Sequence, residues 1–336
     1  MPPDNPSEAL RDTFGRLHDN LRISVTDRCN IRCFYCMPEE NPAYVPRGEV
    51  LTFEEIERFT RVAARLGIRK IRLTGGEPLV RKGLPDLVRL LSAVPGIDDL
   101  ALTTNGVLLA DCARELHDAG LRRINVHLDT LDPDRFRQIT RRDGLEQVLE
   151  GLEEAKRVGL APIKINAVAV RDLTEDDIVP LARFGREHGF DVRFIEFMPL
   201  DADGAWRRDR VLFAADILER ISREVGPLEP APGQDPTAPA SEFRFVDGVG
   251  GVGVIASVSR PFCGSCNRVR LTADGMLRNC LFALDELNVK SLLRSGGTDE
   301  ELAQLLRHSV RLKGEGHEIH AARFVQPPRP MYAIGG

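Results

Sequence analysis

Short apolar runs that alternate with amphipathic segments constrain the fold of this chain more than any other feature. Strands are predicted for six of these runs, at residues 21–26, 70–74, 100–104, 123–128, 163–168 and 192–196. Apolar residues at helical spacing predict helices between them, at 53–66, 84–94, 110–119, 145–158 and 176–188. This alternation is typical of the α/β class, in which helices cover a parallel sheet. Six repeats fit either a doubly wound sheet or an incomplete TIM-like barrel.

Polar and glycine residues gather where the predicted strands end. Parallel α/β folds place their ligands at the carboxyl ends of the strands, so a binding site is expected there. The residues concerned are Thr26, Asp27, Thr74 to Glu77, Thr103 to Gly106, His127, Asp129, Glu196 and Met198.

Three cysteines follow the first predicted strand with the spacing C-x3-C-x2-C: Cys29, Cys33 and Cys36. Three thiolates can hold three irons of a [4Fe–4S] cluster and leave the fourth iron open to a small molecule, whereas ferredoxins close it with a fourth cysteine. The alternatives are a zinc site that lacks one ligand, or unrelated structural thiols. We predict an iron–sulfur cluster with one open iron.

A second triad, Cys263, Cys266 and Cys280, has the spacing C-x2-C-x13-C. It predicts either another open iron–sulfur cluster or a zinc site completed by His317 or His320, and the first is favoured. Arg268 and Arg270 alternate on a predicted strand between these cysteines, so they share one face. Their planar donor groups suit a triphosphate, although a solvated charged face is the alternative.

Several function classes are disfavoured. No apolar run approaches a membrane-spanning length, the N-terminus lacks the basic and apolar regions of a signal peptide, and the net charge of −5 gives no general attraction to nucleic acid. We therefore expect a cytoplasmic protein without nucleic-acid or membrane partners. A G-x-G-x-x-G string at 248–253 precedes a β-branched run instead of a helix, which predicts a hairpin turn between strands at 242–246 and 252–258.

The remainder of the C-terminal third has weaker signals. A Pro- and Ala-rich stretch at 227–240 predicts a loop or linker. Helices are predicted at 285–294 and 298–308, and an irregular tail from residue 324 onward.

The first triad, together with the strand end Gly75-Gly76-Glu77-Pro78, resembles the radical S-adenosylmethionine superfamily. From residue 21 to 336 the chain is similar to the GTP 3′,8-cyclase family of that superfamily, which acts in molybdenum-cofactor biosynthesis. The resemblance is carried by the strings Leu21-Arg-Ile-Ser-Val-Thr-Asp-Arg-Cys-Asn30, Arg72-Leu-Thr-Gly-Gly-Glu-Pro78, Thr103-Thr-Asn-Gly106, Phe197-Met-Pro199, Cys263-Gly-Ser-Cys-Asn-Arg268 and Gly335-Gly336.

The resemblance implies an incomplete (α/β)6 TIM-like barrel over residues 1–225, closed by a C-terminal α+β segment over 226–336. Two [4Fe–4S] clusters are implied, one in each region, with S-adenosylmethionine chelating the open iron of the first. Its reductive cleavage would give a 5′-deoxyadenosyl radical that abstracts the 3′ hydrogen of GTP. The implied product is (8S)-3′,8-cyclo-7,8-dihydroguanosine 5′-triphosphate.

Site residues are implied by position. The resemblance assigns Tyr35, Gly76 and Met198 to the S-adenosylmethionine site. It assigns to the GTP site Arg22, Arg72, Thr103, Lys164, Arg268, Val269 and Arg270. It implies catalytic roles for the first triad, Arg22, Arg268, Arg270, Gly335 and Gly336. Five of these side chains are cationic and suit a triphosphate that has no P-loop, although Lys164 could instead be a snorkelling strand-edge lysine. A frayed terminus is the default for the two glycines.

One position departs from the family pattern. His127 stands where the family usually has a serine that contacts S-adenosylmethionine. The histidine could donate a hydrogen bond to the same ligand, or the contact could be lost, and we include it as a candidate cofactor-binding residue.

The implied partners are GTP, a reductant such as flavodoxin or ferredoxin, and the next enzyme, cyclic pyranopterin monophosphate synthase. A homodimer is one option that the sequence leaves open. The alternatives in function are a peptide-modifying maturase with an auxiliary cluster, an iron–sulfur electron carrier, and a zinc-stabilised binding protein.

Overall fold

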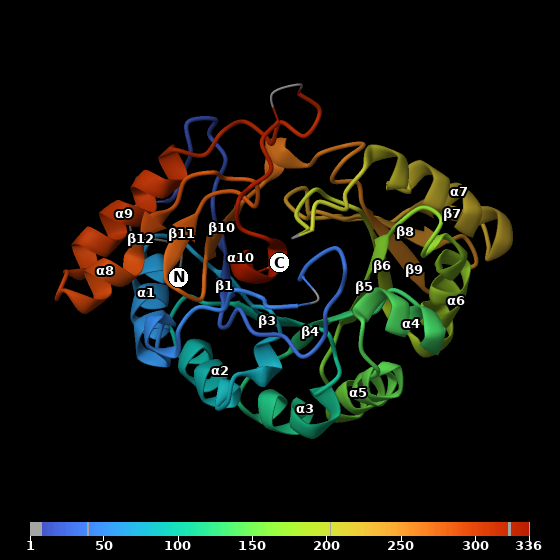
Figure 1. Cartoon of the computed structure of the whole chain (residues 1–336), viewed down its shortest axis with the longest axis horizontal. Helices are drawn as coiled ribbons and strands as arrows, with labels where there is room; N and C mark the ends of the chain where they lie inside the picture. Colours follow the sequence, from blue (N-terminus) through green and yellow to red (C-terminus); the bar gives the residue numbers. More distant parts are fainter. Residues whose placement is uncertain (1–8, 39, 202, 322–323, 336) are drawn as a thin grey trace.

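One curved sheet organises the chain (Figure 1). The computed structural model describes residues 9–335 except Glu39, Ala202, Ala322 and Arg323. Six parallel strands lie side by side in chain order, and all six were predicted from the sequence. They are β1 (Asn20–Ser24), β2 (Lys70–Thr74), β3 (Asp99–Thr104), β4 (Arg123–His127), β5 (Ile163–Ala169) and β6 (Asp191–Glu196).

The C-terminal region extends this sheet at both edges. β10 (Arg268–Leu271) pairs in parallel with β1, and β9 (Gly251–Ile255) pairs in parallel with β6. Antiparallel strands continue outward on each side: β11 (Met276–Arg278) and β12 (Leu287–Asn288) beyond β10, and β8 (Ser241–Phe245) and β7 (Leu228–Pro230) beyond β9. The fold is therefore a partial barrel with a C-terminal segment, as predicted, and the 242–258 hairpin is confirmed.

Helices cover the convex side of the sheet (Figure 1). Five were predicted to within two residues at each end: α1 (Phe53–Arg65), α2 (Leu84–Ser92), α3 (Leu109–Asp118), α5 (Leu145–Val158) and α6 (Ile178–His188). The start of α1 follows from Thr52, whose side chain accepts from the Glu55 N–H while Glu55 accepts from the Thr52 N–H. Such a capping box stabilises a helix by about 1 kcal/mol.

The remaining helices partly correct the sequence interpretation. α4 (Pro133–Thr140) and α7 (Ala214–Glu224) were not predicted. α9 (Asp299–Arg311) was predicted, but α8 (Val289–Arg294) begins later than expected because residues 287–288 pair as β12. The tail is not wholly irregular, since α10 (Met331–Ile334) forms within it.

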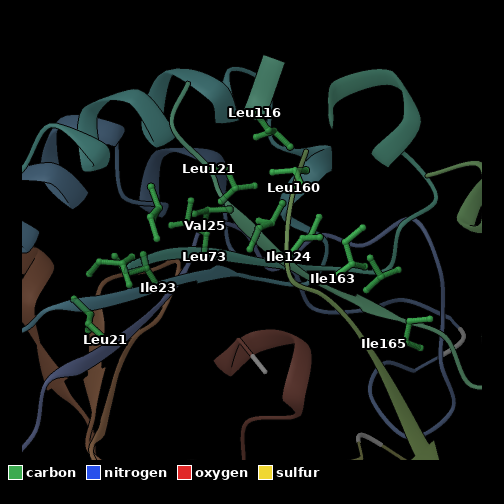
Figure 2. Close-up of a cluster of buried hydrophobic side chains, with 14 of the residues drawn as sticks. Leu21, Ile23, Val25, Leu73, Leu116, Leu121, Ile124, Leu160, Ile163 and Ile165 are labelled. Carbon is green, nitrogen blue, oxygen red and sulfur yellow. The ribbon is translucent and has the colours of Figure 1, made fainter. Parts of the chain in front are cut away.

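The alternation along the strands separates an apolar outer face from a polar inner face. Leu21 and Ile23 of β1, and Leu73 of β2, are fully buried beneath the helices. Figure 2 shows these side chains in one layer with Ile124, Ile163 and residues of the surrounding helices and loops. Because successive side chains point to opposite faces, the alternate positions of the same strands face the concave side.

The concave face is unusually polar for a barrel. The lumen of a TIM barrel is normally filled with branched apolar side chains. Here β1 presents Asn20 and Arg22, β2 presents Lys70 and Arg72, and β5 presents Lys164 and Asn166, and all six line a cavity. The barrel interior is therefore suited to hold a polar ligand.

A buried histidine near the N-terminus predicts acid sensitivity. The His18 ring is fully buried, its Nε2 lies 2.9 Å from Asp12 Oδ2, and its Nδ1 has no hydrogen-bond partner in the part of the chain that the structure describes. Burial, followed by the charge of Lys313, lowers the pKa of His18 to about 4 despite Asp12. Since the folded pKa lies below the unfolded value of 6.5, unfolded chains bind the proton first, so stability falls as pH drops from 6.5 towards 4.

We expect the cluster-free protein to lose about 2 kcal/mol of unfolding free energy from this residue between pH 7 and pH 5. Urea titrations at both pH values would measure it, with His18→Gln as the control that retains an amide donor but cannot titrate. Equal pH dependence of the two proteins would contradict the assignment.

Candidate active site

The first cysteine triad lies on the loop that follows β1. Cys29 and Cys36 are half-buried, Cys33 is buried, and all three thiols are free of disulfides. A tight turn brings the Cys36 and Met37 N–H groups to the Cys33 carbonyl, at 2.9 and 3.0 Å. Asn105, at the end of β3, points its amide nitrogen at Cys29 Sγ, 3.7 Å away. The loop thus offers three thiols with a polar donor nearby, a donor set that fits a [4Fe–4S] cluster.

The glycines at the end of β2 pack against this loop. The Gly76 N–H donates to Thr26 O at 2.7 Å, and the Glu77 N–H donates to Arg28 O at 2.7 Å. A Cβ on Gly75 would meet Thr26 O at 2.6 Å, and a Cβ on Gly76 would meet Arg28 O at 2.4 Å. The two glycines therefore permit a close backbone approach that fixes the segment leading into Cys29.

Gly76→Ala is expected to push this segment away and to cost about 1–3 kcal/mol, because the opposing atom is backbone and cannot turn aside. Iron analysis after anaerobic reconstitution should show impaired loading of the first triad. The matched control is Gly48→Ala, where a Cβ meets nothing within 4 Å. Normal loading and an unchanged melting temperature in Gly76→Ala would argue against this packing role.

Glu77 links neighbouring strand ends beneath the first triad. Its fully buried carboxylate accepts from Thr104 Oγ1 at 2.6 Å, the Asn105 N–H at 2.6 Å and the Leu79 N–H at 2.9 Å. Burial raises the pKa of Glu77 to about 7, and these hydrogen bonds oppose that rise. Because Asn105 in turn faces Cys29, Glu77 supports the first triad from below.

Tyr35, His127 and Asp129 form a compact group beside Cys33. Tyr35 Oη lies 2.5 Å from both Asp129 Oδ2 and His127 Nε2, and His127 Nε2 lies 3.0 Å from the same carboxylate oxygen. Although burial disfavours the charged imidazole, Asp129 raises the pKa of His127 well above its usual value. Met198 packs with Tyr35 on the same small apolar cluster around Phe197. Three predicted cofactor-site residues thus lie close to the first triad.

The second triad flanks the strand pair β10–β11. Cys263 and Cys266 lie on and just after the short helix η6 (Cys263–Ser265), while Cys280 follows β11. Burial disfavours the Cys266 thiolate, but Arg268 and Lys313 outweigh it and lower the pKa of Cys266 to about 6. A thiol that ionises this readily, flanked by two cations, suits a ligand of an iron–sulfur cluster.

A zinc site gains no support from the two candidate histidines. His317 Nε2 lies 3.1 Å from Ser257 O, and His320 Nε2 lies 2.6 Å from Val258 O. Within the described residues, no three His, Cys, Asp or Glu side chains converge on one ion. A cubane cluster spreads its thiolates over different irons, so its ligands need not converge in this way.

The two triads lie at opposite ends of the barrel. β1 and β10 are parallel, with Asn20 opposite Arg268 and Ile23 opposite Leu271. Cys29 follows the carboxyl end of β1, whereas Cys266 precedes the amino end of β10. At ~3.3 Å per residue, a five-residue strand separates these ends by roughly 16 Å.

A cavity of about 590 Å³ extends from the second triad into the barrel. Nearly all the predicted GTP-site residues line it: Arg22, Arg72, Thr103, Lys164, Arg268 and Arg270, together with Cys263, Cys266, Cys280 and Met198. Val269 does not, because its side chain is fully buried in the core on the opposite face of β10. The first triad, Tyr35, Gly76 and His127 are also absent from the lining among the described residues.

The cavity concentrates arginines that have no acidic partner within the described part of the chain. Arg22, Arg72 and Arg270 lie side by side on three neighbouring strands, and no carboxylate of the described chain lies within 4.0 Å of them. Burial, followed by the charge of Arg270, holds the pKa of Arg22 well below its usual value. Burial and neighbouring cations likewise lower the pKa of Arg72 and of Arg270 to about 10. Uncompensated buried charge is costly, so this cavity is built for an anion.

Sequence reasoning missed further cavity residues. Lys70, Arg123, Arg193 and Lys313 also line the cavity. The strand alternation could have identified the first two, which lie two positions from Arg72 and from Asn125. Asp99 pairs with Arg123, and Glu242 pairs with Arg193. The predicted linker forms one wall through residues 231–235 and 237–240, held by Lys70 Nζ at 3.3 Å from Asp235 Oδ2.

The C-terminal tail enters the barrel instead of fraying (Figure 1). Met331 lines the cavity, while the backbone of Tyr332 approaches the Cys36 thiol. Arg270 Nη1 donates to the Gly335 carbonyl at 2.8 Å. α10 therefore lies between the cavity and the first triad. Gly336 lies outside the described residues.

Sequence comparisons identify relatives along nearly the whole chain. The Radical SAM superfamily model matches residues 23–185, and the Molybdenum Cofactor Synthesis C model matches residues 190–319. A GTP 3′,8-cyclase of Rhodopirellula baltica is 51% identical over 98% of this chain and 92% of its own length. The GTP 3′,8-cyclase of Pelotomaculum thermopropionicum is 47% identical over 97% of this chain and all of its own.

Solved structures support the fold. Streptococcus suis SuiB bound to S-adenosylmethionine matches with a TM-score of 0.60 at 15% identity, over 87% of this chain and 68% of that chain. SuiB bound to precursor peptide SuiA matches with a TM-score of 0.61 at 16% identity, over 89% of this chain and 68% of that chain. At such identity the likeness concerns architecture alone.

Among the described helices, none has the length and apolar character needed to span a membrane.

Proposed function

Because this chain belongs to the GTP 3′,8-cyclase family of radical S-adenosylmethionine enzymes, we propose that its arginine-rich cavity holds GTP between the two cysteine triads. The chain is a radical enzyme of molybdenum-cofactor biosynthesis that cyclises GTP. The observation that carries the placement of GTP is the row formed by the half-buried Arg22 and Arg72 and the buried Arg270, which have no carboxylate partner among the described residues. A triphosphate would supply the missing negative charge.

The cations that would bind the triphosphate differ in position and in how far they are already paired. Arg22, Arg72 and Arg270 form one row across neighbouring strands, and Lys164 lies on the facing side of the cavity. Thr103 Oγ1 accepts from Arg72 Nη1 at 3.3 Å and orients that guanidinium. Lys164 lies 3.8 Å from Asp191 and 4.0 Å from Glu242, and is therefore partly neutralised before GTP binds.

Each triad would hold one cluster. The superfamily implies a [4Fe–4S] cluster and S-adenosylmethionine, for which Cys29, Cys33 and Cys36 supply the thiolates. When bound, this pair supplies a carbon radical that can abstract the 3′ hydrogen of GTP. We assign Cys263, Cys266 and Cys280 to a second [4Fe–4S] cluster, whose open iron would face the cavity that these cysteines line.

The other groups orient the two ligands. Tyr35, Gly76, His127 and Met198 would border S-adenosylmethionine, with Asp129 fixing the Tyr35 hydroxyl and the His127 ring. Arg270 holds the Gly335 carbonyl, so the tail would complete the wall between the two ligands and exclude water from the radical step. Gly336, outside the described residues, keeps its proposed catalytic role, and Val269 could contribute only through its backbone.

Two features of the proposal concern the chain as a whole. Residues 1–225 would carry radical generation, and residues 226–336 the second cluster and part of the GTP site. An electron must reach the first cluster from outside, so we propose a protein reductant such as flavodoxin or ferredoxin. Cyclic pyranopterin monophosphate synthase would receive the product.

Anaerobic incubation with GTP, S-adenosylmethionine and dithionite tests the function directly. We expect 5′-deoxyadenosine and the cyclised triphosphate in equal amounts. With both clusters loaded, absence of 5′-deoxyadenosine would remove the radical assignment. Formation of 5′-deoxyadenosine without loss of GTP would remove the substrate assignment, and would favour a peptide-modifying activity only if a peptide were altered.

A further inference from the structure

Lys313 lies beside Cys266 of the second triad although no motif marks it. It follows α9, and only 5% of its surface is exposed. Its Nζ lies 2.8 Å from Arg268 O, 2.7 Å from Asn279 O and 3.3 Å from Cys266 Sγ. An ammonium group has three protons, so these three acceptors account for all of them.

The three acceptors belong to the segments that carry the triad. Arg268 lies two residues after Cys266, and Asn279 directly precedes Cys280. One ammonium group therefore joins the start of β10 to the end of β11 and also faces a cysteine sulfur. The position lines the cavity, but its donors are already used. In this respect Lys313 differs from Arg22, whose Nε has no hydrogen-bond partner among the described residues.

Arg16 provides the complementary link from the N-terminal segment. Its Nη1 donates to Cys263 O at 2.7 Å and to Glu315 O at 2.7 Å, and its Nη2 donates to Gly314 O at 2.6 Å. Asp12 Oδ2 holds Arg16 Nε at 2.5 Å. The Arg16 guanidinium thus fixes the backbone immediately after Lys313 to the loop of Cys263.

We propose that Lys313 is a positioning residue that assembles the second triad and sets the charge beside its cluster, with Arg16 holding the Lys313 segment in place. This inference rests on the proposed function, because it presumes a cluster on that triad. A fixed cation within hydrogen-bonding distance of a ligand sulfur favours the reduced, more negative cluster. Loss of the cation should therefore move the cluster potential to more negative values.

The test uses the full chain with Cys29, Cys33 and Cys36 all replaced by serine, so that only the second cluster contributes to the signal. Lys313→Met retains the length of the side chain but loses the charge, Lys313→Arg retains the charge, and Lys82→Met removes an exposed lysine as the matched control. Iron content, the midpoint potential followed by electron paramagnetic resonance, and GTP affinity are measured for each protein.

We expect Lys313→Met to shift the midpoint potential negative, Lys313→Arg to remain near the parent value, and Lys82→Met to change nothing. GTP affinity should fall less in Lys313→Met than in a variant of Arg22. Loss of iron from Lys313→Met alone also supports the role, because it shows that the charge is needed for assembly. An unchanged potential in Lys313→Met, or equal shifts or equal iron loss in both lysine variants, overturns it.

Failure of the proposed function has a different signature. If the parent protein with an intact second triad binds no iron there, the second cluster itself is absent and the cyclase assignment of this triad fails. If the parent protein has the cluster and only the expected Lys313 effects are missing, the inference about Lys313 fails alone.

Discussion

Cys36→Ser and Cys280→Ser are expected to lose equal amounts of iron but to behave oppositely towards S-adenosylmethionine. The reconstituted wild type should hold about eight irons per chain, and each variant about four. Cys36→Ser removes a ligand at the end of the barrel where Tyr35 and His127 lie, so formation of 5′-deoxyadenosine should fall below detection. Cys280→Ser leaves that end intact and should still cleave S-adenosylmethionine, but without forming cyclised GTP.

Cys112 provides the matched control for both variants. Its sulfur donates to Leu108 O at 3.1 Å within α3, and a serine hydroxyl can replace that bond. Cys112→Ser should retain about eight irons and full activity. If Cys280→Ser also lost 5′-deoxyadenosine while keeping four irons, the two ends of the barrel would not have separate tasks.

Arg22→Met is expected to weaken GTP binding and to stabilise the ligand-free protein. Arg22 is half-buried beside Arg72, Arg268 and Arg270, has no carboxylate partner among the described residues, and leaves its Nε unpaired there. Removing one charge-assisted contact to a phosphate costs about 1.5–3 kcal/mol, or roughly 10- to 100-fold in affinity. Removing one of several like charges relieves repulsion, and methionine keeps the apolar stem volume, so the melting temperature should rise.

The opposite signs of the two effects make this prediction specific. Equilibrium binding of GTP under anaerobic conditions measures the first effect, and thermal unfolding without ligand measures the second. Arg58→Met is the control, because Arg58 pairs with Asp299 on the outer helices and is not among the residues that line the cavity. A fall in both affinity and stability would indicate that Arg22 is a structural residue.

The sequence predicted the six central strands because their outward positions are continuously apolar, as at Ile71 and Leu73. The family resemblance assigned seven residues to the GTP site by position, and six of them line the cavity. Lys313 could not be predicted in the same way, because its three acceptors come from segments 34 to 47 residues away. Val269 was assigned to the GTP site but does not line the cavity. It stands between two cavity arginines on β10, and because side chains alternate along a strand, its own side chain points into the core.

Glu196 shows why a polar residue at a strand end need not bind a ligand. The sequence grouped it with the other polar strand ends, but its buried carboxylate accepts from the backbone N–H groups of Ala214, Val258 and Ser259. It anchors the start of α7 and the segment after β9 to β6. Only the tertiary structure distinguishes such an anchor from a ligand-binding group.

The order of strands in the sheet imposes a condition on synthesis of the chain. β1 and β6, which form the two edges of the central six strands, receive their outer partners β10 and β9 only after more than 250 residues have been made. Until then both edges expose unpaired backbone groups that can pair with other chains. A fragment that ends near residue 225 should therefore aggregate during expression. We also expect the nascent protein to depend on chaperones until its last third emerges from the ribosome.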